Sequence, residues 1–242
     1  QSRSSAASDV YKRQSLKGLV IGTSCTSIGS YAFYFCSNLT GSLVIPDSVT
    51  TIGDYAFGSC NNLTGDLVIP NSVTNIGSFA FYSCDSFDGS LTIPNSVTTI
   101  GSFAFQNCSG LNGSLTIGNS VTTIGSGAFY YCTGLTGSLT IPDSVTTIED
   151  YAFSPGLFNS AFSGPLTIGN GVETIEDYAF NFCSGFTGSL TIPNSVTSIG
   201  NGAFGYCSGF NGSLTIGNSV TTIGGFAFNG CSSITSVSIL AT

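Results

Sequence analysis

Cysteine is the residue of this chain whose type and spacing could most readily do chemistry. The 242-residue sequence holds nine cysteines and no histidine, and no two cysteines form a C-x-x-C pair. A zinc site normally combines closely spaced cysteine and histidine ligands, so a zinc site is not predicted. Eight of the cysteines, from Cys36 to Cys231, instead recur once in each of eight similar segments. Because free cysteine is readily buried, this spacing predicts an inward column of reduced thiols, with sporadic disulfides between neighbours as the alternative.

Catalytic residues are not indicated by the rest of the sequence. Serine and threonine are abundant, but there is no histidine to act as their base, and Lys17 stands alone near the start of the pattern. Neither a G-x-x-x-x-G-K phosphate loop nor a strand-loop-helix dinucleotide unit occurs. We therefore expect a protein that is not an enzyme and that uses no cofactor.

Carboxylates gather at one place in the chain. The pairs Glu149-Asp150 and Glu176-Asp177 lie 27 residues apart, so they take equivalent places in adjacent segments, and Glu173 is near the second pair. Stacked like charges repel each other, and calcium ligated by carboxylate oxygens could offset that repulsion. No calcium-loop spacing accompanies these residues, so a solvated acidic patch is the favoured interpretation and a calcium site the weaker alternative. A carboxylate pair for glycoside hydrolysis is less favoured still, because the pattern shows no sign of a cleft.

All these residues belong to a unit that repeats every 24 residues, of which Gly89 to Asn112 is a representative copy. A period in this range is typical of a solenoid, in which each coil buries its apolar side chains against its neighbours. We expect one elongated domain over residues 15–242, with an insertion near 154–165. The isoleucine that ends each L-T-I step marks the period at Ile21, Ile45, Ile69, Ile93, Ile117, Ile141, Ile168, Ile192, Ile216 and Ile239.

Each coil has three predicted sides. The L-T-I step reads as a strand, because leucine and isoleucine two apart point inward and the residue between them points outward. A Pro-Asx or Gly-Asx dipeptide then turns the chain, and V-T-T-I supplies a second β-branched strand. The third side carries A-F-x-x-C, for which we predict a short α or 3₁₀ turn, since a helical turn places phenylalanine and cysteine on one face.

Composition limits the partners of this chain. Charged residues make up only 7% of it and the formal net charge is −8, so it lacks the basic patch that nucleic acid requires. Polar residues interrupt every apolar run before it could span a bilayer, so no membrane insertion is expected. Residues 4–14 resemble a translated sequencing adapter, and we treat residues 1–14 as a non-native, disordered tail that contributes nothing to the fold. We expect the natural protein to begin upstream.

The tandem pattern L-x-x-L-x-I-P-x-x-V-x-x-I-x-x-x-A-F-x-x-C, from Leu16 to Ile239, resembles the BspA-like, or Treponema-type, leucine-rich repeats. The resemblance implies a leucine-rich-repeat solenoid of right-handed coils, with parallel β-sheets and short helical turns, whose concave face is the first sheet. Members are typically cell-surface or secreted proteins of bacteria and some protists that act in adhesion. It therefore implies a cell-surface or secreted location for this chain.

The outward positions of the first strands form the candidate ligand-binding surface. They make columns of neutral hydroxyls, suited to a repetitive partner, although threonine is also simply a good exposed strand residue. We expect a non-enzymatic adhesion protein that binds protein or glycan here; ice binding by the Ser/Thr columns is the alternative, and a structural spacer is the third hypothesis. Uncapped ends also suggest end-to-end self-association. The candidate binding residues are Ser114, Thr116, Ser138, Thr140, Thr167, Ser189 and Thr191.

Overall fold

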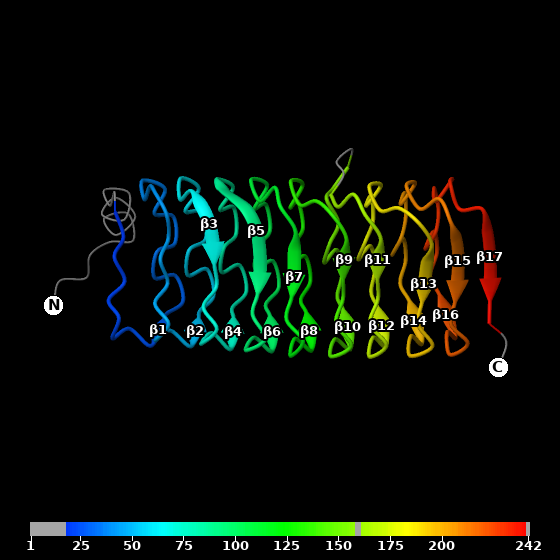
Figure 1. Ribbon diagram of the computed structural model, residues 1–242, viewed down its shortest axis with the longest axis horizontal. Coiled ribbons are helices and arrows are strands. Elements are labelled where there is room, and N and C mark those ends of the chain that lie inside the picture. The colour runs from blue at the N-terminus through cyan, green and yellow to red at the C-terminus, as the bar shows by residue number, and fades with distance from the viewer. Residues whose placement is uncertain (1–17, 158–160, 241–242) are drawn as a thin grey trace.

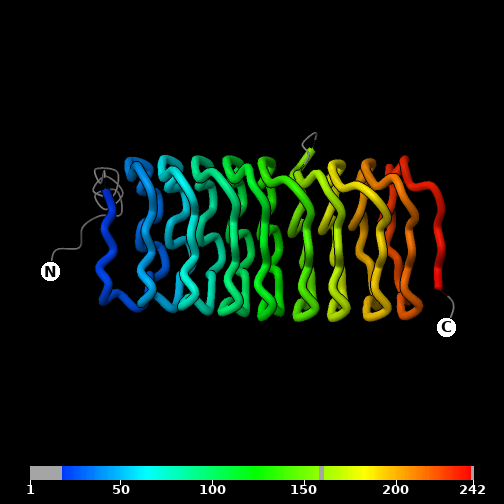
Figure 2. Tube along the Cα trace, viewed as in Figure 1, coloured from blue at the N-terminus to red at the C-terminus, as the bar shows by residue number. Residues whose placement is uncertain are grey.

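The computed structural model describes residues 18–157 and 161–240, which form a row of similar coils stacked along one long axis (Figure 1). Figure 2 traces the same path as a tube, with the N-terminal coils at the blue end and the C-terminal coils at the red end. The fold is a parallel β-solenoid, as the 24-residue period predicted. The proposed tail, residues 1–14, lies outside the described residues.

The V-T-T-I segments form one continuous sheet of nine parallel strands. Equivalent residues pair from coil to coil, as in Thr99 with Thr123 and Ile100 with Ile124. The isoleucine points inward and is buried in the eight strands from β1 to β14, and the residue before it is outward. The strands, in spatial order, are β1 (Ser27–Ile28), β2 (Thr51–Ile52), β4 (Asn75–Ile76), β6 (Thr99–Ile100), β8 (Thr123–Ile124), β10 (Thr147–Ile148), β12 (Thr174–Ile175), β14 (Ser198–Ile199) and β16 (Thr222–Ile223).

The L-T-I segments form the second set of parallel strands, in three groups. Both predicted sheets are therefore confirmed, but the continuous one is the V-T-T-I sheet. The first group is β3 (Gly65–Val68), β5 (Phe87–Ile93) and β7 (Leu115–Ile117); the second is β9 (Leu139–Thr140) and β11 (Leu166–Thr167); the third is β13 (Leu190–Ile192), β15 (Ser213–Ile216) and β17 (Ser236–Ile239).

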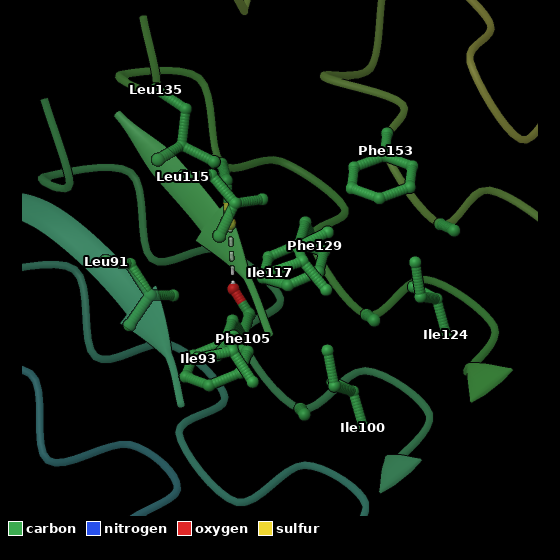
Figure 3. Packing of buried hydrophobic residues seen from close by; sticks show 14 of the residues in the cluster. Leu91, Ile93, Ile100, Phe105, Leu115, Ile117, Ile124, Phe129, Leu135 and Phe153 are labelled. Atoms are coloured by element: carbon green, nitrogen blue, oxygen red, sulfur yellow. Dashed lines mark hydrogen bonds between the residues drawn. The ribbon is translucent and has the colours of Figure 1, made fainter. Parts of the chain in front are cut away.

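A column of stacked phenylalanine rings runs through the core along the whole described solenoid. Neighbouring rings lie 5.2–5.4 Å apart between centroids and within 13° of parallel. Leucine and isoleucine of both sheets pack around these rings. Figure 3 shows Leu91, Ile93 and Ile100 beside Phe105. Each of these four side chains is at most 1% exposed, which confirms the predicted inward set. The column is Phe33, Phe57, Phe81, Phe105, Phe129, Phe153, Phe180, Phe204 and Phe228.

The predicted helical turn on the third side is wrong: no helix occurs in the described residues, and the A-F-x-x-C segment is a run of turns. In one coil Phe103 and Asn107 have φ of 56° and 59°, which no right-handed helix accommodates. Alternate amides therefore donate within the coil, from Cys108 N to Phe105 O at 3.1 Å, and across to the next coil, from Asn107 N to Tyr130 O at 2.8 Å. Stacking satisfies these amides, so it overrides the local helical preference.

The predicted column of inward, reduced cysteines is confirmed. All nine cysteines are free, and those from Cys36 to Cys207 are buried. Each thiol from Cys60 onward donates to the carbonyl of the core phenylalanine of the preceding coil, at 3.0–3.3 Å. One such bond, from Cys132 Sγ to Phe105 O, is the dashed line in Figure 3. Burial raises the pKa of Cys60 and of Cys132 to about 12, so these thiols stay protonated and unreactive at neutral pH.

Candidate ligand-binding face

The strands β7, β9, β11 and β13 place the seven candidate residues on the outside of the L-T-I side. Strand alternation buries the leucine and isoleucine and leaves the threonine between them exposed. The strands pair in register, so Thr140 lies beside Thr167, and Thr191 lies beside Thr215. We call this surface the hydroxyl face; it comprises Ser114, Thr116, Ser138, Thr140, Thr167, Ser189 and Thr191.

The hydroxyl face contains two shallow hollows, and all seven candidate residues line one or the other. Ser114, Thr116, Ser138 and Thr140 line a hollow of about 420 Å³. Thr167, Ser189 and Thr191 line a second one of about 320 Å³. The fold thus brings together residues that are 24 or more positions apart in the sequence, in two clusters.

Corner residues that the sequence reasoning did not propose also line these hollows. Asn119 contributes to the first and Asn170 to the second. The signal was present, because in the eight coils from Ile45 to Ile216 the Pro or Gly after the strand is followed by an Asx residue. In the sequence, this position predicts only a turn former. Part of that role is real: Asn170 N donates to Asp143 Oδ1 at 2.6 Å, which links neighbouring corners.

The threonine hydroxyls of the hydroxyl face are available to a ligand. Thr116, Thr140, Thr167 and Thr191 make no side-chain hydrogen bond to any described residue. The first threonines of V-T-T-I behave differently, since each donates to the carbonyl of the preceding coil, as Thr122 Oγ1 does to Thr98 O at 3.2 Å. Two kinds of threonine column therefore exist, one used by the fold and one not.

Charge is nearly absent from the two hollows. No lysine, arginine or histidine occurs between residues 18 and 242. The residues that line the hollows are hydroxyl, amide, apolar or proline side chains. A third hollow on the same side, of about 560 Å³, does include a carboxylate, Asp66, beside Val68 and Thr92. The arrangement suits a neutral ligand recognised by hydrogen bonds.

The five carboxylates proposed as a weaker calcium site are partly used by the fold. Asp177 N donates to Asp150 Oδ1 at 3.0 Å, and Ser126 N donates to Glu149 Oε2 at 2.8 Å. Glu173 takes the place of a V-T-T-I threonine, in a column other than that of Glu176. Partial burial, and then the charges of Asp150, Asp177 and Glu149, raise the pKa of Glu176. Within residues 18–157 and 161–240, no group of three or more histidine, cysteine or acidic residues is arranged to hold a metal ion.

Comparison with known proteins places the repeats among described sequences and folds. The sequence matches the family described as "BspA type Leucine rich repeat region", in six copies, over residues 4–135 and 154–242. A search of curated proteins gave no match. The described part of the chain contains no helix that could cross a bilayer.

Several solved structures are similar to the solenoid. A leucine-rich repeat protein from Bacteroides ovatus is 29% identical, with a TM-score of 0.75 over 94% of this chain and 61% of that one. One from Eubacterium ventriosum is 24% identical, with a TM-score of 0.50 over 94% of this chain and 74% of that one. A leucine rich cell surface protein from Faecalibacterium prausnitzii is 24% identical, with a TM-score of 0.45 over 94% and 80%. The chain spans 61% of the length of the B. ovatus protein.

Proposed function

Because this chain belongs to the BspA-type leucine-rich repeat family, we propose that it is a non-enzymatic, cell-surface or secreted adhesion protein whose hydroxyl face binds a protein or glycan. The observation that carries the proposal is the pair of neutral hollows that together contain all seven candidate residues. The chain covers only 61% of the B. ovatus protein, so location and ligand are parts of this proposal.

The chemistry of the face supports a polar, uncharged ligand surface. Free threonine hydroxyls recur once per coil along the row, and the corner amides of Asn119 and Asn170 border the two hollows. Such a row can engage a repetitive or extended partner at several coils simultaneously, and several weak contacts then add into useful affinity. Because the face consists of outward side chains, it can be substituted without disturbing the core.

The test compares Thr140→Lys with Glu176→Gln on arrays of glycans and matrix proteins. We expect Thr140→Lys to abolish binding and Glu176→Gln to retain it, with each variant unfolding within about 0.5 kcal/mol of wild type, as is usual for surface substitutions. Loss of binding in Glu176→Gln alone would move the site to the acidic patch. Absence of any binding by wild type would contradict the adhesion proposal and leave a structural spacer.

Ice binding is the second candidate, and the in-register threonine pairs favour it. Thr92 pairs with Thr116, Thr140 with Thr167, and Thr191 with Thr215, so hydroxyls repeat at the strand spacing of about 4.8 Å. Measurement of thermal hysteresis separates the two functions. Ice-growth inhibition that Thr140→Lys removes, without binding on the arrays, would replace adhesion by ice binding.

A further inference from the structure

A second aromatic column lies on the outside of the A-F-x-x-C side, on the residue before each alanine. Its rings stack from coil to coil, with centroid distances of 4.9 Å for Tyr31–Tyr55, 4.5 Å for Tyr55–Phe79 and 5.0 Å for Tyr151–Tyr178. We call it the outer aromatic column. Glycine replaces the aromatic residue at two of the nine positions of this column. The positions are Tyr31, Tyr55, Phe79, Phe103, Gly127, Tyr151, Tyr178, Gly202 and Phe226.

The two glycines interrupt the column in different surroundings. Beside Gly127 the same coil carries Tyr130, whose ring lies 5.7 Å from that of Tyr151 and 4.2 Å from that of Tyr131. Beside Gly202 the equivalent of Tyr130 is Gly205. At Gly202, the aromatic ring of the column and the side chain three residues later are therefore both missing. A hollow of about 300 Å³ opens there.

The walls of this Gly202 hollow are aromatic. Tyr178 and Phe226 are the column members on either side of Gly202, and Phe182 and Tyr206 stack on each other at 4.8 Å with 2° between their planes. Tyr206 is 49% exposed, so its ring forms part of an accessible surface. Flat aromatic walls are suited to a ligand that has a flat apolar face, because C–H bonds with partial positive charge are attracted to the negative face of the ring.

Two amide side chains complete the lining, those of Asn181 and Asn229. Asn181 is only 8% exposed, and its Nδ2 donates to Gly202 O and Gly205 O, both at 3.2 Å. Both amide hydrogens are therefore engaged, which fixes the orientation of the group. Its Oδ1 accepts no hydrogen bond from a described residue and is not one of the fully buried unpaired atoms, so it is an accessible acceptor at the hollow. A hydroxyl group of a ligand can donate a hydrogen bond to this fixed acceptor.

Charge further restricts the ligand. No basic side chain occurs from residue 18 to 242, whereas Asp177 directly precedes Tyr178, so an anion would be repelled. A quaternary ammonium ion would gain from the rings but has no hydrogen to donate to Asn181 Oδ1. A neutral pyranose sugar has both a flat face of C–H bonds and hydroxyl donors. We propose that the Gly202 hollow is a binding site for a neutral pyranose unit of a glycan, separate from the hydroxyl face.

The key variant restores the missing ring. Gly202 has φ of 58°, the same value as Tyr178, which shows that tyrosine is compatible with this backbone at equivalent positions. A side chain at Gly202 would approach Tyr178 Cε1 to 2.6 Å, so that ring must tilt toward the parallel stacking of the other pairs. Gly202→Tyr should therefore fill the hollow while the solenoid stays folded. Gly127→Tyr is the matched control, since Gly127 has φ of 59° and contacts Phe103 in the same way.

The experiment is titration calorimetry with saturation-transfer NMR, using cellopentaose, chitopentaose and mannopentaose as neutral probes and pentagalacturonate and tetramethylammonium as charged ones. We expect at least one neutral probe to bind, with saturation transferred to the C–H protons of its ring face. Gly202→Tyr and Tyr206→Ala should each weaken that binding tenfold or more, while Gly127→Tyr changes it less than twofold. Thr140→Lys is measured in parallel to compare this hollow with the hydroxyl face. Thermal unfolding confirms that each variant is folded.

Three outcomes would overturn the proposal. The first is that no neutral probe binds wild type at millimolar concentration. The second is that a folded Gly202→Tyr and a folded Tyr206→Ala bind as wild type does. The third is that only tetramethylammonium or pentagalacturonate binds. Loss of sugar binding in Thr140→Lys, with Gly202→Tyr unaffected, would assign the sugar to the hydroxyl face instead, so the two sites are distinguished.

Discussion

The coil that contains Asn107 and the coil that contains Pro155 differ in their third side, although both begin with the same Ala-Phe pair. Asn107 has φ of 59° and donates its N–H to Tyr130 O at 2.8 Å. Pro155 stands at the equivalent place, and proline has neither an N–H nor access to positive φ. Positive φ appears one residue later, at Gly156, with 79°. The chain departs from the regular path there, where the other coils have their cysteine.

The core continues through the irregular coil nevertheless. Phe153 stacks on Phe129 at 5.3 Å and on Phe180 at 5.2 Å, as the regular coils do. After the insertion, Phe162 takes the buried place that Leu135 has in the preceding coil, and its ring stacks on that of Phe186 at 5.1 Å. The comparison teaches that one backbone position sets the outline of a coil, while the inward side chains hold the stack together. Four measurements would sharpen or break this comparison.

The largest effect is expected from the phenylalanine column. Phe105→Ala and Phe153→Ala should each lower the free energy of unfolding by about 3 to 5 kcal/mol, because each leaves a large cavity between two stacked rings. Urea unfolding followed by circular dichroism measures the loss. If Phe153→Ala cost under about a third of Phe105→Ala, the core would not be equivalent in the two coils.

The next effect concerns the backbone position itself. Asn107→Pro should cost about 3 kcal/mol, because proline cannot adopt the positive φ and removes the bond to Tyr130 O. The control Asn107→Ser keeps the backbone N–H. Serine also occurs at the equivalent position Ser83 with φ of 53°, so this variant should cost far less. Equal stability of the two variants would show that Pro155 is not the cause of the irregular path.

The thiol column should give a smaller effect that depends on pH. Cys132→Ala removes the bond to Phe105 O and should cost about 1 to 2 kcal/mol at pH 7. The pKa of this thiol is about 12 in the fold, against about 8.5 in the unfolded chain. Its stabilisation is therefore full below about pH 8.5 and is lost by about 1.4 kcal/mol per pH unit as the pH rises toward 12.

Urea unfolding of wild type and Cys132→Ala from pH 7 to 10.5 checks the sign. Because the variant lacks one titrating thiol, the two curves should approach each other above about pH 8.5 and cross before about pH 10.5, where the variant becomes the more stable. In the irregular coil, Gly156 stands where the other coils have the cysteine, so no thiol donates to Phe129 O. That coil therefore adds nothing to the pH dependence of stability. Parallel curves would mean that the thiol ionises equally in both states.

The smallest effect belongs to the acidic pair beside the insertion. The pKa of Glu176 is raised by partial burial and by its acidic neighbours, so its ionised form is disfavoured in the fold. The destabilisation appears as the pH rises above the unfolded pKa of about 4.3. Glu176→Gln should thus stabilise by a few tenths of a kcal/mol at pH 7 and by nothing near pH 3. Thermal scans at both pH values measure the difference, and a loss at pH 7 would contradict it.

Much of the fold was predictable from the period. Repetition every 24 residues places identical side chains in register, so the inward leucine, isoleucine, phenylalanine and cysteine columns followed from their spacing. The hydroxyl columns followed from strand alternation in the same way. Asn119 and Asn170 were missed, because a turn-forming residue gives no sign of which surface it borders.

The sequence by itself thus determined the coil, its inward columns and the outward threonines, because these depend only on residue type and regular spacing. Only the tertiary structure decided the positive-φ turns in place of a helix, since their amides are satisfied by the next coil and by no local partner. It also decided the Gly202 hollow. That site arises because Tyr178, Gly202 and Phe226 belong to three successive coils, and a missing side chain becomes a cavity only when its neighbours are stacked around it.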